Sequence, residues 1–197
     1  LLRKRLGSGK LLSVRQDGLE RILFLDFETV NELGDVVTIT LATEIMGKYS
    51  NLIIIGQDGR IIDSLKRVDD AMSRERLVLP NMTYTAPPRE ERLNFLIASD
   101  EDMRERIKGC VGKSAAKCLI SVFEGISPIL AREWIFRACD GRDITSEDFD
   151  DVTVDRIIAE IKKTRDEFFG GDRHYTLVTE PDGTLKDFCF TDIRQYG

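Results

Sequence analysis

The fold of the first half of the chain is decided by residues 44–80, EIMGKYSNLIIIGQDGRIIDSLKRVDDAMSRERLVLP. Residues 52–55 form an apolar and mostly β-branched run, Asp58-Gly59 is a turn signal, and residues 60–65 return to an extended pattern. Aspartate followed by glycine between two such runs is typical of a hairpin loop. The stretch therefore predicts a tight antiparallel β-hairpin.

A cluster of polar residues follows this hairpin and consists of Lys66, Arg67, Ser73, Arg74 and Arg76. Several cationic donors beside a hydroxyl group suit an anionic partner, and phosphate is the natural candidate. Acidic residues lie among them in the sequence, namely Asp63, Asp69, Asp70 and Glu75. A solvated loop without a ligand is therefore the alternative interpretation.

Turn residues such as Asp17-Gly18 separate further strand-like segments on the amino-terminal side. We expect strands at residues 10–16, 20–30, 35–44, 51–56 and 60–66. Their order and short connections predict an antiparallel β-meander, or half of a β-sandwich. Pro80, Pro87 and Pro88 then interrupt the pattern, so we expect a domain boundary in this connector.

Helical patterns occupy most of the second half of the chain. We expect helices at residues 100–108, 113–123 and 128–139, and one longer amphipathic helix within 146–169. The apolar stripe of the longer helix, which we expect to face a core, is Val154, Ile157, Ile158, Ile161 and Phe168. Residues 173–178 and 184–190 predict a terminal hairpin that returns to the first sheet. The predicted fold class is α+β, with domains at 1–88, 89–170 and 171–197.

The turn at Gly125, Ile126 and Ser127 joins two predicted helices and resembles a helix-hairpin-helix motif. The glycine can end the first helix, and the serine, which precedes a proline, can cap the second. Backbone amides of such a turn can face a phosphate, but many copies of the motif serve only as packing units. The nearby Glu124 and Glu133 favour the packing role.

The composition is that of an ordinary globular protein. The chain has 197 residues, of which 42% are hydrophobic and 32% charged, and no apolar run is long enough to cross a membrane. The net charge of −6 lies entirely in residues 98–197, whereas residues 1–16 hold five basic residues and no acidic one. A basic edge on an acidic protein is compatible with selective RNA contact and argues against indiscriminate phosphate binding.

The cysteines, the single histidine and the start of the chain limit which sites and locations are expected. The four cysteines lie far apart without metal-ligand spacing, so we expect reduced thiols, no metal site and no cofactor. His174 stands alone in a predicted strand, where a structural role is expected. The opening LLRKRL, closed by Gly7-Ser8-Gly9, predicts the last turn of a helix, so we expect the chain to begin inside a longer protein. Without a signal peptide, we expect a cytoplasmic location.

A co-linear set of segments carries a resemblance to a known family: LLRKRL, NELGDVVT, EIMGKYSN, GRIIDSLKRV, MSRERLVLP, GISPILARE and DFCFTDIRQYG. Over nearly the whole chain, they resemble the NFACT amino-terminal domain family, which includes bacterial RqcH, the fibronectin-binding protein A homologues and eukaryotic NEMF. The resemblance implies that the family's initial portion and its coiled coil lie outside this chain.

The family's fold is similar to that of the formamidopyrimidine-DNA glycosylases, so the resemblance implies a β-sandwich combined with helix-hairpin-helix elements. The catalytic residues of that fold would precede Leu1, and none is assigned here. The resemblance therefore implies a binding and recruitment factor, not an enzyme.

The resemblance also implies a role in ribosome-associated quality control. Family members bind the large ribosomal subunit that carries peptidyl-tRNA with an obstructed nascent chain, and they recruit further tRNA. They promote untemplated carboxy-terminal tails, chiefly of alanine in bacteria, while the ribosome performs the peptidyl transfer. The expected partners are therefore tRNA, with alanine tRNA as the expected species, and the large ribosomal subunit.

Two groups of functional residues of the family correspond to positions in this sequence. The family's Asp-Arg pair, which serves tRNA recruitment and tailing, falls on Glu20-Arg21. Its Glu-Ile-Met-Gly-Arg segment falls on Glu44, Ile45, Met46, Gly47 and Lys48. Both groups depart from the family pattern, because Glu20 has an added methylene and Lys48 lacks the planar guanidinium fork. We expect Arg21, with Glu20 fixing its rotamer, to read an unstacked anticodon-loop base, while Lys48 and the polar cluster hold phosphates.

Other function classes compete with this one. A scaffold that docks on the ribosome without selecting tRNA is kept open by Glu20 in place of aspartate, and Glu20-Arg21 can also be a solvated strand start. A surface adhesin that binds fibronectin is suggested by the family's older name and opposed by the reduced-looking cysteines. A glycosylase-like enzyme would be revealed by cleavage of a damaged-base duplex.

Overall fold

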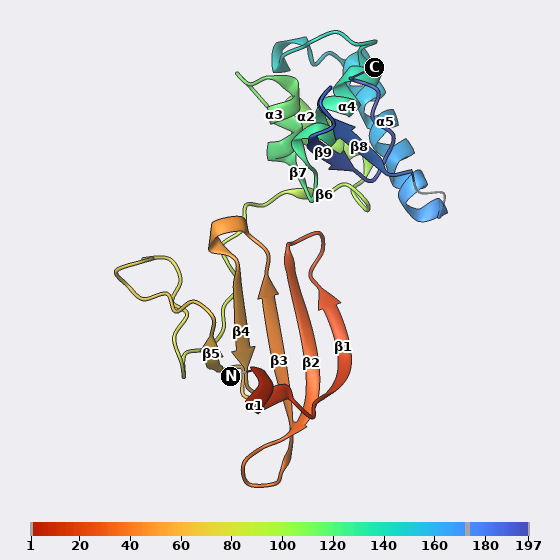
Figure 1. The fold of residues 1–197 in the computed structure, drawn as a ribbon. Coiled ribbons are helices and arrows are strands. Elements are labelled where there is room, and N and C mark those ends of the chain that lie inside the picture. Colours follow the sequence, from red (N-terminus) through yellow and green to blue (C-terminus); the bar gives the residue numbers. More distant parts are fainter. Residues whose placement is uncertain (1, 172–173, 197) are drawn as a thin grey trace. The chain divides into compact units, whose positions relative to one another are not determined.

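The structure, a computed structural model, describes residues 2–171 and 174–196. The chain divides into a first unit at residues 1–90 and a second unit at residues 91–197 (Figure 1). The first unit contains α1 (Leu2–Leu6), β1 (Lys10–Gln16), β2 (Ile22–Val30), β3 (Val36–Glu44), η1 (Gly47–Tyr49), β4 (Asn51–Ile55) and β5 (Ile61–Ser64). The second contains β6 (Leu93–Asn94), α2 (Asp100–Lys108), α3 (Ala115–Val122), β7 (Phe123–Glu124), α4 (Pro128–Ala138), η2 (Ser146–Asp148), α5 (Asp151–Gly170), β8 (Thr176–Thr179) and β9 (Leu185–Cys189).

The first unit is built on a five-stranded sheet in the order β1-β2-β3-β4-β5, and every neighbouring pair is antiparallel. The predicted meander is thereby confirmed, with most strands one to three residues shorter at one or both ends. Gly59, at a φ of +76°, takes the turn conformation that the sequence predicts for the β4–β5 hairpin. Because all five strands pair with their sequence neighbours, the order of the sheet follows from local connections.

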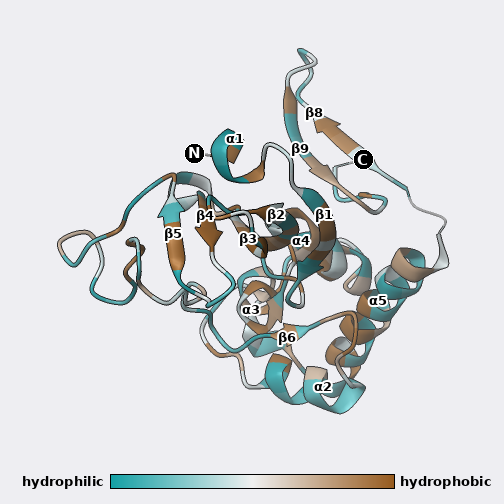
Figure 2. Cartoon of the chain, turned by 90° about the horizontal axis from the view of Figure 1, so that it is seen from below, coloured by the Kyte–Doolittle hydropathy of each residue, from teal (hydrophilic) through white to brown (hydrophobic). Residues whose placement is uncertain are grey.

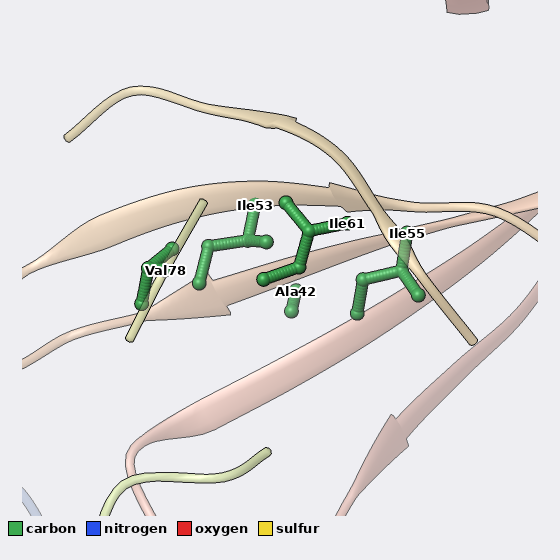
Figure 3. Packing of buried hydrophobic residues seen from close by; sticks show 5 residues of the cluster. All are labelled: Ala42, Ile53, Ile55, Ile61 and Val78. Atoms are coloured by element: carbon green, nitrogen blue, oxygen red, sulfur yellow. The ribbon is translucent and has the colours of Figure 1, made fainter. Parts of the chain in front are cut away.

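One face of this sheet carries a small hydrophobic core. The buried side chains of Ala42, Ile53, Ile55 and Ile61 lie together on the strands, and Val78 reaches them from the segment that follows β5 (Figure 3). That segment is tied down by reciprocal backbone hydrogen bonds between Val68 and Val78, of 3.1 and 2.8 Å. The polar cluster of residues 66–76 is therefore held over the sheet at both of its ends.

The second layer of the predicted β-sandwich is not formed by the described part of the first unit. The strands β1 to β5 all belong to one sheet, in which each strand pairs with its neighbours in the sequence. The opposite face carries the cross-strand row Leu25, Leu41 and Ile54, of which Ile54 is buried and the two leucines are half-buried. The resemblance to the glycosylase fold stays a prediction.

Helices α2 to α5 surround the core of the second unit. The Trp134 ring stands edge-on to Phe95 and Phe123, with centroids 5.6 and 6.1 Å away, and its Nε1–H donates to Thr164 Oγ1 at 2.8 Å. Ser127 caps α4, as the sequence predicts, and accepts a hydrogen bond from Leu130 N. Figure 2 shows the apolar stripe of α5 against its hydrophilic side. The predicted stripe is buried at Val154, Ile157, Ile158 and Ile161 and half-buried at Phe168.

The terminal hairpin belongs to the second unit. β8 and β9 pair with each other as a separate two-stranded sheet, and Thr191, just beyond β9, donates to Glu167 of α5 at 2.7 Å. The segment after β9 packs on the helices of this unit, where it supplies backbone amides to the buried Glu133. The predicted return to the five-stranded sheet stays a prediction. The predicted strand start at Arg173 lies outside the described residues.

Asp26, in the middle of β2, is a carboxylate that side chains of neighbouring strands hold in place. Its carboxylate accepts hydrogen bonds from Ser13 at 2.5 Å, Thr40 at 2.7 Å and Arg15 Nε at 2.8 Å. The Arg15 guanidinium holds the pKa of this carboxyl well below its usual range, although burial opposes the shift. Because the folded-state pKa is depressed, the stabilisation is complete above the unfolded-state pKa of about 4 and is lost as the pH falls below it.

We therefore expect Asp26→Asn to lower the free energy of unfolding of the first unit by about 1–2 kcal/mol at pH 7. The deficit should shrink as the pH is lowered from 4 towards 2, because the carboxyl of the unfolded parent chain then takes up a proton that the folded chain still excludes. Urea denaturation of both proteins at several pH values measures this. A deficit that is constant over the whole range would contradict the assignment.

Candidate nucleic-acid interface

One end of the five-stranded sheet gathers most of the residues that the sequence singles out for RNA contact. β2 begins at Ile22 opposite Glu44, the last residue of β3, and Glu44 pairs in turn with Asn51 of β4. The turn before β2 and the segment between β3 and β4 therefore lie beside each other at this end (Figure 1). A hydrogen bond of 2.8 Å from Ile45 N to Arg21 O joins them.

A groove of about 770 Å³, called here the sheet-end groove, lies at this end of the sheet. Its apolar lining consists of Met46, Tyr49, Val68, Met72, Val78, Pro87 and Pro88. Its polar lining consists of Glu44, Lys48, Asn51, Lys66, Ser73, Glu75 and Arg76. The structure thus brings together six predicted site residues that lie in separate segments of the sequence. The predicted residues Glu20, Arg21, Ile45, Arg67 and Arg74 do not line it.

Glu44 lies at the base of the groove with only 3% of its side chain exposed. Its two carboxylate oxygens accept hydrogen bonds from Arg76, with Nη1–Oε2 at 3.0 Å and Nη2–Oε1 at 2.6 Å. The Tyr84 hydroxyl donates to Oε1 at 3.0 Å. Burial of the phenol, together with the charge of Glu44, raises the pKa of Tyr84. Tyr84 therefore stays a neutral donor, and the buried carboxylate is paired and hydrogen-bonded, as such a charge requires.

The sequence suggests that Arg76 is a cation available to a phosphate, but in the structure its guanidinium binds Glu44. Its side chain is 12% exposed, and besides the two bonds to Glu44 its Nε donates to Thr85 O at 2.6 Å. Its guanidinium carbon also lies 5.2 Å from the centre of the Tyr84 ring. Arg76 is therefore part of the wall of the groove and not a cation on its rim.

The segment between β3 and β4 forms the first rim of the groove. Gly47 adopts a φ of +57°, which allows the short helix η1, and Met46 N donates to Ser50 Oγ at 2.9 Å. Lys66 Nζ donates to Lys48 O at 2.9 Å, which ties the segment after β5 to this rim. Lys48 extends over the Tyr49 ring, with Nζ 4.8 Å from the ring centre. The rim is therefore an ordered surface that carries an exposed aromatic ring and two ammonium groups.

Glu20 and Arg21 stand beside this rim. Arg21 is exposed and Glu20 is half-buried, and neither side chain forms an ion pair or hydrogen bond within residues 2–171 and 174–196. The expected contact in which Glu20 fixes the Arg21 rotamer is thus not made in the structure. The Arg21 guanidinium keeps its donors available, and its backbone is held by Ile45.

The second rim is formed by residues 69–75 and carries Ser73 and Arg74 of the polar cluster, whereas Arg67 precedes it. Ser73 Oγ accepts hydrogen bonds from the amides of Glu75 and Arg76, so this hydroxyl shapes the loop. Arg67 is paired with Asp63 at 3.2 Å, whereas Arg74 is exposed. Of the predicted cations in this segment, Lys66 and Arg74 are thus the better placed to meet a ligand.

The turn at Gly125, Ile126 and Ser127 lies in the second unit and not in the sheet-end groove. Gly125 has a φ of +71°, and the Ser127 side chain caps α4. Glu133, whose charge would oppose a phosphate at this turn, is 1% exposed and bonded to Arg137 at 2.7 Å. Its charge is therefore compensated inside the protein.

Several groove residues were not singled out from the sequence. Tyr49 is 70% exposed and Met72 is 69% exposed, and both present apolar surface to the groove. Pro87 and Pro88 were interpreted only as a connector, although they also line it. Tyr84 holds Glu44 from a position 40 residues later in the chain, and no sequence pattern indicates this contact.

The arrangement suits a nucleotide better than a compact anion. Apolar and aromatic surfaces in the groove can receive an unstacked base, while the ammonium groups of Lys48 and Lys66 stand where a phosphate can approach. Among the residues that the structure describes, no group of His, Cys, Asp and Glu side chains could hold a metal ion. No described helix is long and apolar enough to cross a membrane.

Comparison with known proteins identifies a matching family model and proteins of similar sequence. The family model of NFACT N-terminal and middle domains matches residues 1–197. The protein called Rqc2 homolog RqcH from Bacillus subtilis (strain 168) is 35% identical over 139 residues, which are 70% of this chain and 24% of that protein. The chain thus spans about a quarter of this relative.

Solved structures are similar too. The crystal structure of the fibrinogen binding protein from Staphylococcus aureus has a TM-score of 0.76 at 27% identity, and the match covers 98% of this chain and 66% of that one. The N-terminal structure of the fibronectin/fibrinogen-binding protein from Streptococcus suis has a TM-score of 0.59 at 30% identity, with coverage of 82% and 56%.

Proposed function

The chain belongs to the family of NFACT N-terminal and middle domains, and from this we propose that it is the tRNA-binding part of a ribosome-associated quality control factor. It binds tRNA, with alanine tRNA as the expected species, and the large ribosomal subunit that carries an obstructed nascent chain. It thereby supports untemplated alanine tailing. The chain acts by recruitment and holds no catalytic residue of its own, since the ribosome makes the peptide bond.

The observation that carries this proposal is the sheet-end groove. Residues of the family's Glu-Ile-Met-Gly-Arg segment line it together with Lys66, and the backbone of Arg21 is bonded to the same rim. A groove with apolar walls and cationic rims is what single-stranded RNA loops require, because their bases are unstacked and their phosphates remain charged.

Selection and positioning are then carried by different side chains. The exposed Arg21 reads the edge of an anticodon-loop base, because a guanidinium offers a planar set of donors. Lys48 and Lys66 hold backbone phosphates, which fix the register of the RNA without reading its sequence. The turn at Gly125–Ser127 is a second phosphate contact in the same proposal, to a different part of the RNA.

Replacement of Arg21 and Glu20 by alanine tests the selective contact. We expect the parent chain to bind one tRNA of a purified panel preferentially, and the double variant to lose this preference while it keeps weak binding to all. Fluorescence anisotropy with labelled tRNAs measures both. Equal loss of affinity for every tRNA would remove the selective role of Arg21.

Replacement of Lys48 and Lys66 by alanine tests the phosphate contacts. Each lost contact should reduce the slope of log K against log salt by about one, so the double variant should bind all tRNAs more weakly and with a flatter salt dependence. Lys10→Ala is the matched control, because Lys10 is exposed at the opposite end of the same sheet. An unchanged slope in the double variant would place the phosphates elsewhere.

Binding that is absent, or unselective and insensitive to all these variants, would favour a ribosome-docking scaffold. Because the structural relatives are named as fibrinogen- or fibronectin-binding proteins, binding of the chain to immobilised fibronectin and fibrinogen should be measured as well. Saturable binding to either protein, without tRNA binding, would favour the adhesin alternative. Cleavage of a damaged-base duplex would favour the glycosylase-like alternative.

A further inference from the structure

The ion pair of Glu44 and Arg76 connects the two rims of the sheet-end groove. Glu44 is the residue directly before the first rim, and Arg76 is the residue directly after the second rim. The bidentate contact therefore joins the roots of both loops, which are 32 residues apart in the chain. A bidentate guanidinium–carboxylate pair restricts both distance and orientation, so it sets the spacing of the rims as well as their proximity.

Tyr84 anchors this pair to the body of the sheet. Its ring packs on the hydrophobic core of the first unit and stands edge-on to Phe24, with centroids 5.9 Å apart. Its hydroxyl donates to Glu44, and its amide donates to Gly59 O at 3.0 Å in the β4–β5 hairpin. The pair is thus fixed to the hydrophobic core of the first unit and to the β4–β5 hairpin.

From these contacts, and resting on the proposed function, we infer that Arg76 and Tyr84 are positioning residues that act through Glu44. They hold the two rims at one spacing and so determine which tRNA fits the groove, while Arg76 makes no phosphate contact of its own. Its small exposure and its three engaged nitrogens carry this assignment.

Arg76→Lys and Tyr84→Phe distinguish a positioning role of Arg76 from a phosphate contact. Lysine keeps the positive charge, so it would preserve a phosphate contact, but it lacks the planar fork that grips both oxygens of Glu44. Phenylalanine changes no charge and removes only the hydroxyl that donates to Glu44. Neither substitution can therefore affect selectivity by removing a cation.

We expect both variants to reduce the ratio of affinities between the preferred and the least preferred tRNA by about three- to tenfold, with the salt slope unchanged. Asp26→Asn is the matched control, because it removes an ionic contact from the same sheet away from the groove, and it should leave the ratio intact. A ratio that survives in both variants would overturn the inference. So would an Arg76→Met variant whose salt slope falls by about one while Arg76→Lys behaves like the parent chain.

Hydrogen exchange without RNA keeps this test independent of the proposed function. In Arg76→Lys and Tyr84→Phe, the exchange of amides at residues 45–50 and 69–75 should accelerate more than in the rest of the first unit, whereas Asp26→Asn should show no such excess at the two rims. If the parent chain binds no tRNA, the proposed function fails, and faster exchange at both rims still supports the positioning role. Unchanged exchange at both rims would overturn it even where tRNA binding is observed.

Discussion

Glu44→Ala is expected to lower the free energy of unfolding of the first unit by about 3–5 kcal/mol, because it leaves the Arg76 guanidinium buried without its partner. The cost is large for a single ion pair because Glu44 is buried and Arg76 is mostly shielded from water, with side-chain exposures of 3% and 12%. The Tyr84 hydroxyl loses its acceptor in the same substitution.

Hydrogen exchange of residues 36–55 as a function of urea measures this loss within the first unit. Glu32→Ala is the matched control, since Glu32 is also ion-paired, to Lys4 at 2.8 Å, but both side chains are about two-thirds exposed. Exposed pairs are worth under about 1 kcal/mol. Similar effects of the two substitutions would show that the Glu44 pair is hydrated in solution.

Glu133→Ala is expected to destabilise the second unit by a similar amount, about 3–5 kcal/mol. Glu133 is 1% exposed, and its Oε1 accepts from Arg137 Nε at 2.7 Å. Its Oε2 accepts from the backbone amides of Arg194 and Gln195, at 3.0 and 3.1 Å. The substitution would leave Arg137 without its closest carboxylate and two backbone amides without an acceptor, so the segment after β9 should also detach.

Urea denaturation followed by the fluorescence of Trp134 measures this effect, because the chain has a single tryptophan and its ring lies in the core of the second unit. Glu105→Ala is the control, since Glu105 is exposed on α2 of the same unit. We expect it to shift the transition by less than about 0.5 kcal/mol. A Glu133→Ala transition at the parent midpoint would show that the tail is held by its hairpin alone.

Local patterns predicted much of the fold. The β-branched run at Leu52–Ile55 with its Asp58-Gly59 turn forms the β4–β5 hairpin, and α2 spans the predicted residues 100–108. Ser127 caps α4 at the predicted position. These features depend on neighbours within a few residues, where turn chemistry, capping and hydrophobic period act. The longer helix predicted within residues 146–169 is α5, and η2 and the Asp150 cap occupy the residues before it.

The candidate site was predicted in part. The family motif and the polar cluster after the hairpin identified six of the residues that line the sheet-end groove. They did not show that Arg76 is buried, because a cation in a charged loop has the same sequence signature whether it faces water or a carboxylate. They also did not identify Tyr84, whose contact with Glu44 joins residues 40 positions apart.

The sequence by itself therefore determined the five strands of the first unit, helices α2 to α5, the Ser127 cap and the family, since each is encoded in local patterns or in co-linear motifs. Only the tertiary structure decided that Arg76 serves Glu44, that the two rims meet in one groove, and that the terminal hairpin joins the helices. The physical reason is the same in each case. Burial and long-range pairing decide whether a charged group is compensated inside the protein or left for a partner, and neither can be read from spacing along the chain.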